Sequence, residues 1–420
     1  MKTREHLVTV EALAPSGDGV AQIDGKAVHL ADVLPGERVR VVIERGAPVV
    51  RELIEASPER VVPRCAVFDR CGGCAWQHAS EGLQRASRLA LLRRALPADL
   101  RDIPVAWHAS PSPWAWRTRA RLAWETRGTS ISLGFRERRS HGVVATDACP
   151  VLDPALEGAL RPLAARLALV AKRGEVSLAL GVGGAPVASV HPDRSLMAGA
   201  YAACAALASD GFAGVALWVE GASVPAITGD PRPRAMGADG APLVLGVDGF
   251  AQANASLNAS LAEAVVRHCP AENRRVLELY AGAGNFTVLL AKKAASVTAV
   301  EGDLDAAAAM RENLAARSIT NVSVRAESAE RCADAKADVV VLDPPRTGAR
   351  EVVEALAKRS DLRALVYVSC DPATLGRDLA TLRARYAVTA IEAFEMFPQT
   401  AHVETVVALT RATAGRQRVW

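Results

Sequence analysis

Hydrophobic and polar positions follow three patterns along the chain. In residues 1–56, five short apolar-polar runs are separated by the turn signals PSGDG, DGK, LPGE and RGAP: HLVTVEAL, GVAQI, AVHL, RVRVVIE and VVRELIEA. Short strands with glycine-rich turns predict a small β-barrel of the OB type over residues 1–58. A predicted helix follows near 79–96, and residues 104–245 show a mixed series of strand and helix patterns.

From about residue 246 the pattern becomes regular. The short apolar runs RRVLEL, SVTAVE, ADVVVLD and ALVYVSC alternate with the helical stretches FTVLLAKKA, DAAAAMRENLAAR and EVVEALAKR. Such alternation predicts a doubly wound, mostly parallel, Rossmann-like sheet. We therefore expect three parts: the barrel (1–58), a cysteine-containing segment with a central α/β domain (59–245), and a doubly wound domain (246–420). The sequence leaves open which part the helix near 79–96 packs on.

Polar residues stand where the predicted parallel strands end. Glu301, Asp343 and Cys370 each follow an apolar run, and glycines follow Leu279. In doubly wound sheets, ligands bind outside the carboxyl ends of the strands. This edge is therefore the predicted functional site.

The loop YAGAGNF (280–286) follows the first of these strands. Gly282 and Gly284 allow a sharp turn and a close approach of the backbone to a ligand. Glu301, 17 residues after Gly284, can accept both hydroxyls of a ribose. The loop lacks the third glycine of the dinucleotide fingerprint, and Glu278 precedes it. These departures favour S-adenosylmethionine over a dinucleotide as the cofactor.

A thiol and an acid form a second candidate group. Cys370 ends the strand ALVYVSC, and Glu404 precedes the apolar run TVVAL. A strand-end cysteine is usually an inert packing residue, and such an acid is usually only a strand-end acid. Together they supply a specific chemistry, in which a thiolate adds to an electron-poor ring carbon and a base removes a proton from the neighbouring carbon. We expect His402 to orient or pack rather than to act as the base.

The charge of the chain is uneven. The net charge of +4 is too small to indicate a nucleic-acid partner by itself. Residues 114–141, however, contain two glutamates, interleaved aromatic residues and seven arginines: Arg117, Arg119, Arg121, Arg127, Arg136, Arg138 and Arg139. Such a strip can contact phosphates and stack on bases, but it is equally typical of a solvated sheet face in an arginine-rich protein.

The apolar runs place limits on the location of the protein. None approaches the roughly 20 residues that a membrane span needs, and the start MKTREHLVTV has no apolar signal-peptide segment. We expect a cytoplasmic protein with no membrane partner, and no pattern indicates an obligate protein partner.

Four cysteines have the spacing of a metal site. Cys65, Cys71 and Cys74 lie between the barrel and the central domain, and Cys149 precedes a proline. Without a secretory signal, disulfides are not expected. Zinc sites usually show two C-x2-C pairs and this set has one, so a [4Fe–4S] cluster is favoured over zinc or unrelated thiols.

Taken together, the motifs resemble those of the RNA uracil-5-methyltransferases, in particular the 23S ribosomal RNA branch with an N-terminal TRAM barrel and an iron–sulfur cluster. The motifs are GFAQANASLN, ELYAGAGNF, AVEGD, LDPPRTG, YVSCDPATLGRD and MFPQTAHVE, and the resemblance extends over the whole chain. It implies that Cys370 is the nucleophile, Glu404 the base, and the four cysteines the cluster ligands. It also implies that the following residues line the cofactor, the role of the last being less fixed in the family: Gln252, Tyr280, Asn285, Glu301, Asp343 and Ser328.

The reaction implied is S-adenosylmethionine-dependent methylation of uridine C5 in 23S rRNA, giving 5-methyluridine through a covalent bond between Cys370 and C6. The substrate is naked rRNA or an assembling particle. The same reaction on tRNA is the first alternative, although tRNA-modifying relatives generally lack the barrel and the cluster. A non-catalytic RNA-binding iron–sulfur protein would show damage at Cys370 or Glu404, and both are present. An amino-group methyltransferase would leave Cys370 unexplained and commonly has an aromatic residue in place of Arg346.

Overall fold

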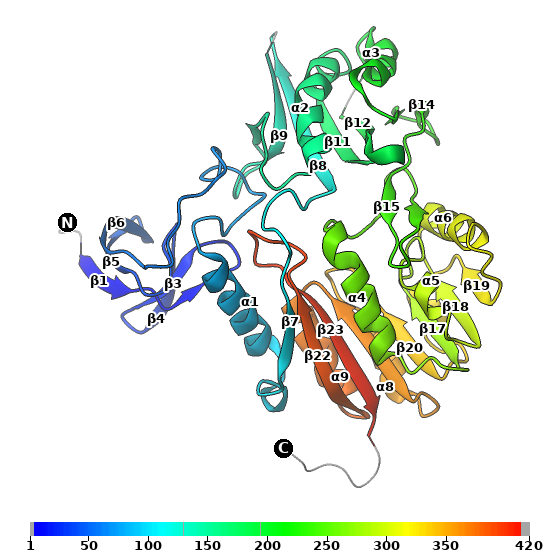
Figure 1. Cartoon of the computed structure of the whole chain (residues 1–420). Helices are drawn as coiled ribbons and strands as arrows, with labels where there is room; N and C mark the ends of the chain where they lie inside the picture. The colour runs from blue at the N-terminus through cyan, green and yellow to red at the C-terminus, as the bar shows by residue number, and fades with distance from the viewer. Residues whose placement is uncertain (1–3, 129, 194, 413–420) are drawn as a thin grey trace.

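The computed structural model describes residues 4–128, 130–193 and 195–412. Figure 1 shows the barrel on the left, the central part at the top and the large sheet at the lower right. None of the helices in these ranges is long and apolar enough to cross a membrane.

The N-terminal barrel is built from two three-stranded sheets, in the orders β1-β5-β6 and β2-β3-β4. Its strands are β1 (Glu5–Thr9), β2 (Ala12–Leu13), β3 (Gly19–Ile23), β4 (Lys26–Leu30), β5 (Arg38–Glu44) and β6 (Ala47–Glu55). The predicted run HLVTVEAL divides into β1 and β2 because the chain changes partner there. The Val10 amide still donates to the Glu37 carbonyl next to β5, at 2.9 Å, whereas the Glu11 amide donates to the Val20 carbonyl of β3, at 2.7 Å. Leu30, Val39 and Val41 fill the core of the barrel.

The central part is α/β, as expected, but its strands are mostly antiparallel. Its sheet has the order β10-β9-β8-β11-β12-β13-β14, and only β12 and β13 run parallel. The strands are β8 (Arg119–Arg127), β9 (Ser130–Arg136), β10 (Val143–Ala145), β11 (Arg173–Leu180), β12 (Pro186–Pro192), β13 (Gly214–Leu217) and β14 (Ala226–Gly229). Helices α2 (Pro154–Leu167) and α3 (Ala200–Ala206) pack against it.

The local sequence explains where α2 lies. Asp153 caps it by accepting from the Ala155 amide, and Pro154 occupies the first helical position, where its missing N–H has no cost. Its buried leucines recur at helical spacing and join the core of the central sheet: Leu156, Leu160, Leu163 and Leu167. The hairpin of β15 (Arg234–Met236) and β16 (Pro242–Val244) then leads towards the large sheet.

The large sheet confirms the doubly wound fold. Its order is β19-β18-β17-β20-β21-β23-β22-β7, with β19 to β21 parallel and β23 antiparallel to both of its neighbours. The strands are β17 (Arg275–Leu279), β18 (Ser296–Val300), β19 (Val322–Arg325), β20 (Val339–Leu342), β21 (Ala364–Ser369), β22 (Tyr386–Phe394), β23 (Glu404–Arg411) and β7 (Val105–His108).

Helices cover both faces of this sheet, and every residue of β20 and β21 is buried. The helices are α1 (Glu81–Ala95), α4 (Ala255–His268), α5 (Thr287–Leu290), α6 (Leu304–Ala315), α7 (Ala329–Cys332), α8 (Arg350–Lys358) and α9 (Pro372–Leu382). Leucines of α1, α8 and α9 form one apolar layer, whereas α4, α5 and α6 contribute to the other. A strand covered on both sides reads as a continuous apolar run, as VVVL and ALVYVS do.

The predicted helix near 79–96 is α1, and it lies on the large sheet, in contact with α9. Strand β7 extends the same sheet by pairing in parallel with β22. Part of the segment 59–245 therefore supports the sheet formed by residues beyond 246. Sequence patterns do not show this, because β7 is an isolated four-residue strand far from its partner in the chain.

A buried carboxylate holds this added strand in place. Glu392 of β22 accepts hydrogen bonds from His108 Nε2 at 2.7 Å and from Arg267 at 2.9 Å, and it also contacts His268 Nε2 at 2.5 Å. These partners come from β7 and from the last turn of α4. One carboxylate thus joins three elements that are distant in sequence.

We predict that Glu392→Gln lowers the free energy of unfolding by about 1–3 kcal/mol, because donors that surround a charge would then face a neutral amide. Urea denaturation measures this change. The matched control is Glu263→Gln on the exposed face of α4, which should change stability by less than about 0.5 kcal/mol. Equal losses in the two variants would contradict the role given to Glu392.

Candidate active site

The predicted site residues lie along one edge of the large sheet. Leu279 of β17 is in register with Val300 of β18 and with Leu342 of β20. Tyr280, Glu301 and Asp343 follow these strand ends directly, so their backbones lie at the same level of the sheet. Parallel strands bring their carboxyl ends to one edge, as the sequence predicted.

The glycine loop turns sharply at this edge. Gly282 and Gly284 have φ values of 57° and 93°, and Tyr280 also has a positive φ of 63°. Glu301 supports the loop, because its carboxylate accepts from the Gly282 and Asp303 amides, both at 2.8 Å. Each carboxylate oxygen keeps a further lone pair, so Glu301 can still accept ribose hydroxyls.

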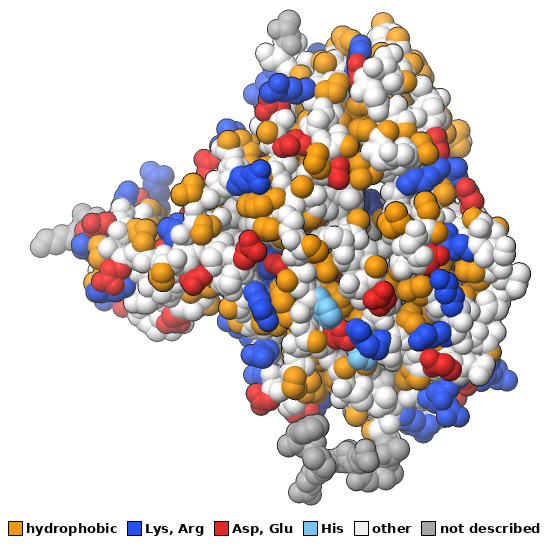
Figure 2. All heavy atoms as spheres, in the orientation of Figure 1, with side chains coloured by type: hydrophobic (Ala, Val, Ile, Leu, Met, Phe, Trp, Pro, Cys, Tyr) orange, Lys and Arg blue, Asp and Glu red, His pale blue; other side chains and the backbone are white. Residues whose placement is uncertain are grey.

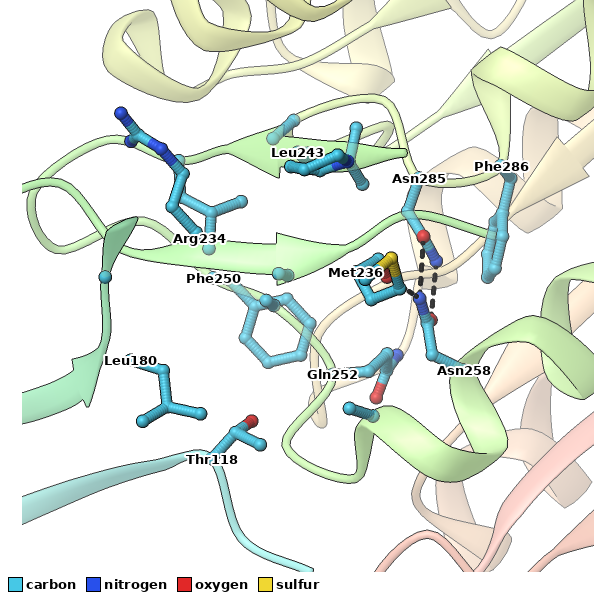
Figure 3. Close-up of a pocket in the computed structure, with 18 of the residues that line it drawn as sticks. Thr118, Leu180, Arg234, Met236, Leu243, Phe250, Gln252, Asn258, Asn285 and Phe286 are labelled. Carbon is cyan, nitrogen blue, oxygen red and sulfur yellow. Dashed lines mark hydrogen bonds between the residues drawn. The ribbon is translucent and has the colours of Figure 1, made fainter. Parts of the chain in front are cut away.

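A cavity of about 520 Å³ opens above the loop and is lined by Gln252, Tyr280, Asn285 and Asp343 among others. In Figure 3 polar amides and apolar side chains share its wall: Gln252, Asn258 and Asn285, with Leu180, Leu243, Phe250 and Phe286. Asn258 and Asn285 exchange two hydrogen bonds of 2.8 and 2.9 Å, drawn as dashed lines. The sequence did not indicate Asn258 as a site residue, because its pairing with Asn285, 27 residues away, becomes visible only in the folded structure.

The cavity fits a nucleoside-containing cofactor. The Gln252 side-chain oxygen is buried without a hydrogen-bond partner among the described residues. Such an atom costs free energy unless a ligand supplies a donor. Ser328 lies outside the cavity lining, is exposed and precedes α7. It stands close to Gly302, where an added Cβ would lie 4.0 Å from the Ser328 Cα, so it borders the loop of Glu301 rather than the cavity.

The register between β21 and β23 brings the thiol and the acid together. These strands are antiparallel, and Ser369 opposite Thr405 is their last ladder pair. The next position of the same register places Cys370 opposite Glu404. Directly opposed residues project their side chains from the same face of a sheet. Thirty-odd residues separate them in sequence, but the fold makes them neighbours.

The electrostatics of this pair favour its protonated state. Burial, assisted by Glu404 and Asp343, raises the pKa of the Cys370 thiol to about 12, and Arg346 opposes the shift. Burial and Asp343 likewise raise the pKa of Glu404 well above its usual range. Burial raises the pKa of Asp343 to about 7. Attack by the thiol therefore requires that its proton be handed to another group.

His402 is a weak base that packs within its own loop. Burial, with Arg346 nearby, lowers the pKa of its imidazole to about 4. The ring packs edge-on against Phe397 at 5.9 Å, and its backbone amide donates to the Thr400 hydroxyl at 3.3 Å. The imidazole is thus neutral near pH 7 and fixed by its own loop.

Most arginines of the 114–141 strip are paired with acids. The pairs are Arg121 and Arg136 with Glu175, Arg127 with Glu125, Arg138 with Asp32, and Arg139 with Asp18. In agreement, Figure 2 shows basic and acidic side chains interspersed over the visible face. Among the seven, only Arg117 and Arg119 form no ion pair with a described residue. Both line a cavity of about 470 Å³ that shares Phe250 with the cofactor cavity.

Three of the four predicted cluster ligands lie in or against the core of the central part, and Cys65 is half-buried outside it. Cys71 and Cys149 belong to that core, and Cys74 packs against it. The pKa values of Cys71 and Cys74 are raised, by burial first and then by the neighbouring thiols, Cys65 included. Burial and Cys74 raise the pKa of Cys149 to about 12. Mutual electrostatic effects of this kind require short distances between the groups.

In the described part of the chain, no three Cys, His, Asp or Glu side chains lie close enough to bind a single metal ion. Gly72 allows the loop to approach β9 closely, since an added Cβ would lie 2.9 Å from the Arg136 carbonyl oxygen.

A doubly wound sheet with a glycine loop, an acid after β18 and a cavity at the carboxyl edge defines an S-adenosylmethionine-dependent methyltransferase. The tRNA (Uracil-5-)-methyltransferase family matches residues 245–339 and 332–412, and the TRAM domain matches residues 1–49. The chain belongs to the RNA uracil-5-methyltransferase family and is an enzyme of that class.

The similarity to curated relatives extends over almost the whole chain. Proteins named 23S rRNA (uracil(1939)-C(5))-methyltransferase RlmD from Pectobacterium carotovorum and Dichelobacter nodosus are 34% and 36% identical. The matches cover 98% and 96% of this chain, and 95% and 98% of those proteins. A Pseudomonas putida protein of the same name is 36% identical over 96% of this chain and 93% of its own length.

A solved structure shares the complete fold. The tRNA (uracil-54, C5)-methyltransferase of Pyrococcus abyssi, in complex with S-adenosyl-L-homocysteine, matches with a TM-score of 0.76 at 23% identity. The match covers 96% of this chain and all of that one, which leaves too few residues unmatched to omit the 58-residue barrel. The expectation that tRNA-modifying relatives lack the barrel is therefore wrong for the Pyrococcus abyssi enzyme. The presence of a barrel does not by itself show whether the substrate is rRNA or tRNA.

We predict that alkylation of Cys370 by iodoacetamide accelerates about tenfold per pH unit between about pH 7 and 10, without a plateau, because the raised thiol pKa keeps the thiolate fraction small. Peptide mass spectrometry follows Cys370 separately from the other cysteines. Glu404→Gln removes a charge that raises this pKa, so it should increase the rate at the upper end of the range. A plateau already below about pH 8 would mean that the thiol pKa is lowered instead.

Proposed function

We propose that the protein methylates C5 of a uridine in 23S rRNA through a covalent bond between Cys370 and C6. The observation that carries the proposal is the register that places Cys370 opposite Glu404, at the edge where the cofactor cavity opens. A thiol and a buried base on one face of a sheet, near a methyl donor, suit this reaction and are not needed for methylation of an amino group.

Each reacting residue has a separate task. The Cys370 thiol first releases its proton to water, and the thiolate sulfur forms a bond to C6 while the C5=C6 double bond opens to an enolate that attacks the methyl group. Glu404, as the carboxylate, then takes the proton from C5; the C5=C6 bond re-forms, and the C6–S bond breaks with its electrons returning to sulfur. Its raised pKa makes Glu404 a stronger base than an exposed glutamate, since burial penalises the charged carboxylate.

The cofactor roles are argued from the cavity and the loop beside it. S-adenosylmethionine, when bound, supplies the electrophilic methyl group. Of the cavity residues, Gln252 would offer its amide oxygen to a donor and Asn285 its amide. Glu301 does not line the cavity, but it bonds the Gly282 amide in the cavity wall and would offer its carboxylate to ribose hydroxyls. Tyr280 and Asp343 would complete the wall. We keep Ser328 as a contact on the adenine side, supported only by its place beside the loop of Glu301.

The choice of 23S rRNA is supported by relatives of that name that match at 34–36% identity over almost the whole chain. tRNA stays the alternative because a tRNA enzyme shares the fold. Either the naked rRNA or an assembling particle would present the uridine, and such a substrate would place the enzyme in the cytoplasm. The reacting base must leave its stack to reach Cys370, which is cheapest in a single-stranded loop.

The test is transfer of labelled methyl from S-adenosylmethionine to unmodified 23S rRNA and, separately, to unmodified tRNA, followed by nucleoside analysis. We expect 5-methyluridine from 23S rRNA. Cys370→Ala should abolish turnover while cofactor binding survives, because the thiol lies outside the cofactor cavity lining. Glu404→Gln should accumulate a protein–RNA adduct that resists denaturation, since the proton at C5 cannot be removed.

The other outcomes would contradict separate parts of the proposal. Label in tRNA alone would support methylation of uridine C5 but reject 23S rRNA as the substrate. Normal turnover by Cys370→Ala would reject the covalent route, and a lack of adduct with Glu404→Gln would reject Glu404 as the base.

We also propose that Cys65, Cys71, Cys74 and Cys149 hold a [4Fe–4S] cluster. The support is that Cys71, Cys74 and Cys149 share one core and that Cys65 is near enough to Cys71 and Cys74 to raise the pKa of both, after burial. Four thiolates are the ligand set of such a cluster. The cluster would brace the junction of the barrel and the central sheet, since Arg138 joins Cys71 and Cys74 to Asp32 of the barrel.

We predict that anaerobically purified protein contains about four iron atoms per chain and absorbs broadly in visible light. Cys149→Ala should lose most of both. The matched control is Cys204→Ala, because Cys204 is buried in the same core without belonging to the set. Stoichiometric zinc in place of iron, or equal iron loss in the two variants, would contradict the assignment.

A further inference from the structure

Helix α1 buries a polar surface where an apolar stripe would be expected. Its buried residues are Gln84, Ser87, Arg88 and Leu92. Leu92 joins the apolar layer under the large sheet, but Gln84 and Arg88, one turn apart, face the segment 395–402. Buried polar side chains are costly unless every hydrogen bond is made. None of them takes part in the chemistry described above.

Arg88 is fully buried and uses its guanidinium on three sides. It donates to Glu395 Oε1 at 2.7 Å, to the Thr400 carbonyl at 2.9 Å and to Gln84 Oε1 at 3.1 Å. The guanidinium also stacks near the Trp76 ring, 5.4 Å from its centroid. Burial lowers the pKa of Arg88, but Glu395 opposes this shift and favours the charged form. One side chain thus spans the segment from residue 395 to residue 400.

Gln84 forms hydrogen bonds with Gln399, in the middle of the same segment. Its Nε2 donates to Gln399 Oε1 at 3.0 Å, and its Oε1 accepts from the Gln399 backbone amide at 3.1 Å. This reciprocal pair fixes both the side chain and the backbone of Gln399. Both glutamines are almost completely buried, so water does not compete for these bonds.

Gln399 is held in a conformation that it would not adopt alone. Its φ is 68°, in the left-handed region, which a residue with a side chain occupies at a cost of about 1–3 kcal/mol. In this conformation its carbonyl accepts from the Ala75 and Trp76 amides at 3.1 and 3.0 Å. Since Ala75 follows Cys74 directly, the strained residue is tied to α1 on one side and to the four-cysteine loop on the other.

The held segment leads directly to the proposed base. Residues 395–403 connect β22 to β23, and β23 begins with Glu404. Glu404 lies one position beyond the last ladder pair with β21. Its orientation towards Cys370 therefore depends on the segment that precedes it. Cys370 itself lies between β21 and α9. Helix α1 packs on α9, but the Gln84 and Arg88 side chains make no hydrogen bond to a described residue of β21 or α9.

We propose that Gln84, Arg88, Glu395 and Gln399, here the α1 clamp, position Glu404 for removal of the C5 proton. The clamp residues are positioning residues, since none touches the reacting atoms. The inference rests on the function proposed above and deepens it. Under this proposal the two steps of the reaction differ in what they need. Formation of the bond between Cys370 and C6 does not need the clamp, whereas removal of the C5 proton by Glu404 does.

We predict that Arg88→Met lowers turnover about 100-fold, the size of effect expected when a reacting group is misplaced by about 1 Å. The same variant should accumulate the denaturation-resistant protein–RNA adduct, as Glu404→Gln does, while its affinity for S-adenosylmethionine stays unchanged. Gel analysis of the adduct and calorimetric titration of the cofactor supply these two readouts. Arg88→Lys keeps the charge beside Glu395 but not the fork of donors, so it should restore turnover only in part.

The matched control is Arg93→Met, the same change on the exposed face of α1, which should turn over like the wild type. Gln399→Gly is a second clamp variant for the case that Arg88→Met does not fold. Glycine accepts the positive φ and keeps the carbonyl that bonds Ala75 and Trp76, but it loses the side chain that pairs with Gln84. It should lower turnover about tenfold and also accumulate adduct.

The outcomes separate the clamp from the proposed function. Adduct accumulation with intact cofactor binding in either clamp variant supports the clamp. Turnover like the wild type in both variants, or lost turnover without adduct, overturns it. If the wild type and Arg93→Met form no 5-methyluridine in either RNA, the proposed function has failed instead.

Discussion

The antiparallel pairing of β23 with β21 is the constraint on which the reactive centre depends. Parallel strands deliver only their carboxyl ends to the ligand edge of the sheet. An antiparallel neighbour delivers its amino end to the same edge, so the first residue of β23 can face the residue that follows β21. A slip of one position would turn Glu404 to the opposite face. The buried pairs Val366 with Ala408 and Tyr367 with Val407 fix the register against such a slip.

Burial of the reacting groups raises their pKa values, because it disfavours their charged forms. Cys370, Glu404 and Asp343 all hold their protons more tightly because they are desolvated and close together. Arg346 opposes the shift for both Cys370 and Glu404. With a pKa of about 12, the Cys370 thiol keeps its proton in the free enzyme near pH 7. The same burial gives Glu404 the basicity that proton removal needs, provided that the segment before it holds its orientation.

Five of the seven arginines in the 114–141 strip form ion pairs, and two of these pairs join the central part to the barrel. Arg138 and Arg139 bind acids of the barrel, and Arg138 also reaches the four-cysteine loop. Arg117 and Arg119, which form no ion pair with a described residue, line a cavity instead. The modest net charge of the chain is compatible with this local arrangement.

The sequence by itself determined the doubly wound fold, the barrel and the strand-end positions of Glu301, Asp343 and Cys370, because period, turn residues and run length are local properties. It also brought forward Gln252 and Asn285 through family motifs. Only the tertiary structure decided that Cys370 faces Glu404, that β7 extends the large sheet, and that five strip arginines are paired. The α1 clamp was equally invisible, since a buried Gln84 or Arg88 reads as part of a polar helix face until its partners, more than 300 residues away, are placed. Contacts between distant segments depend on register and packing, which no local pattern encodes.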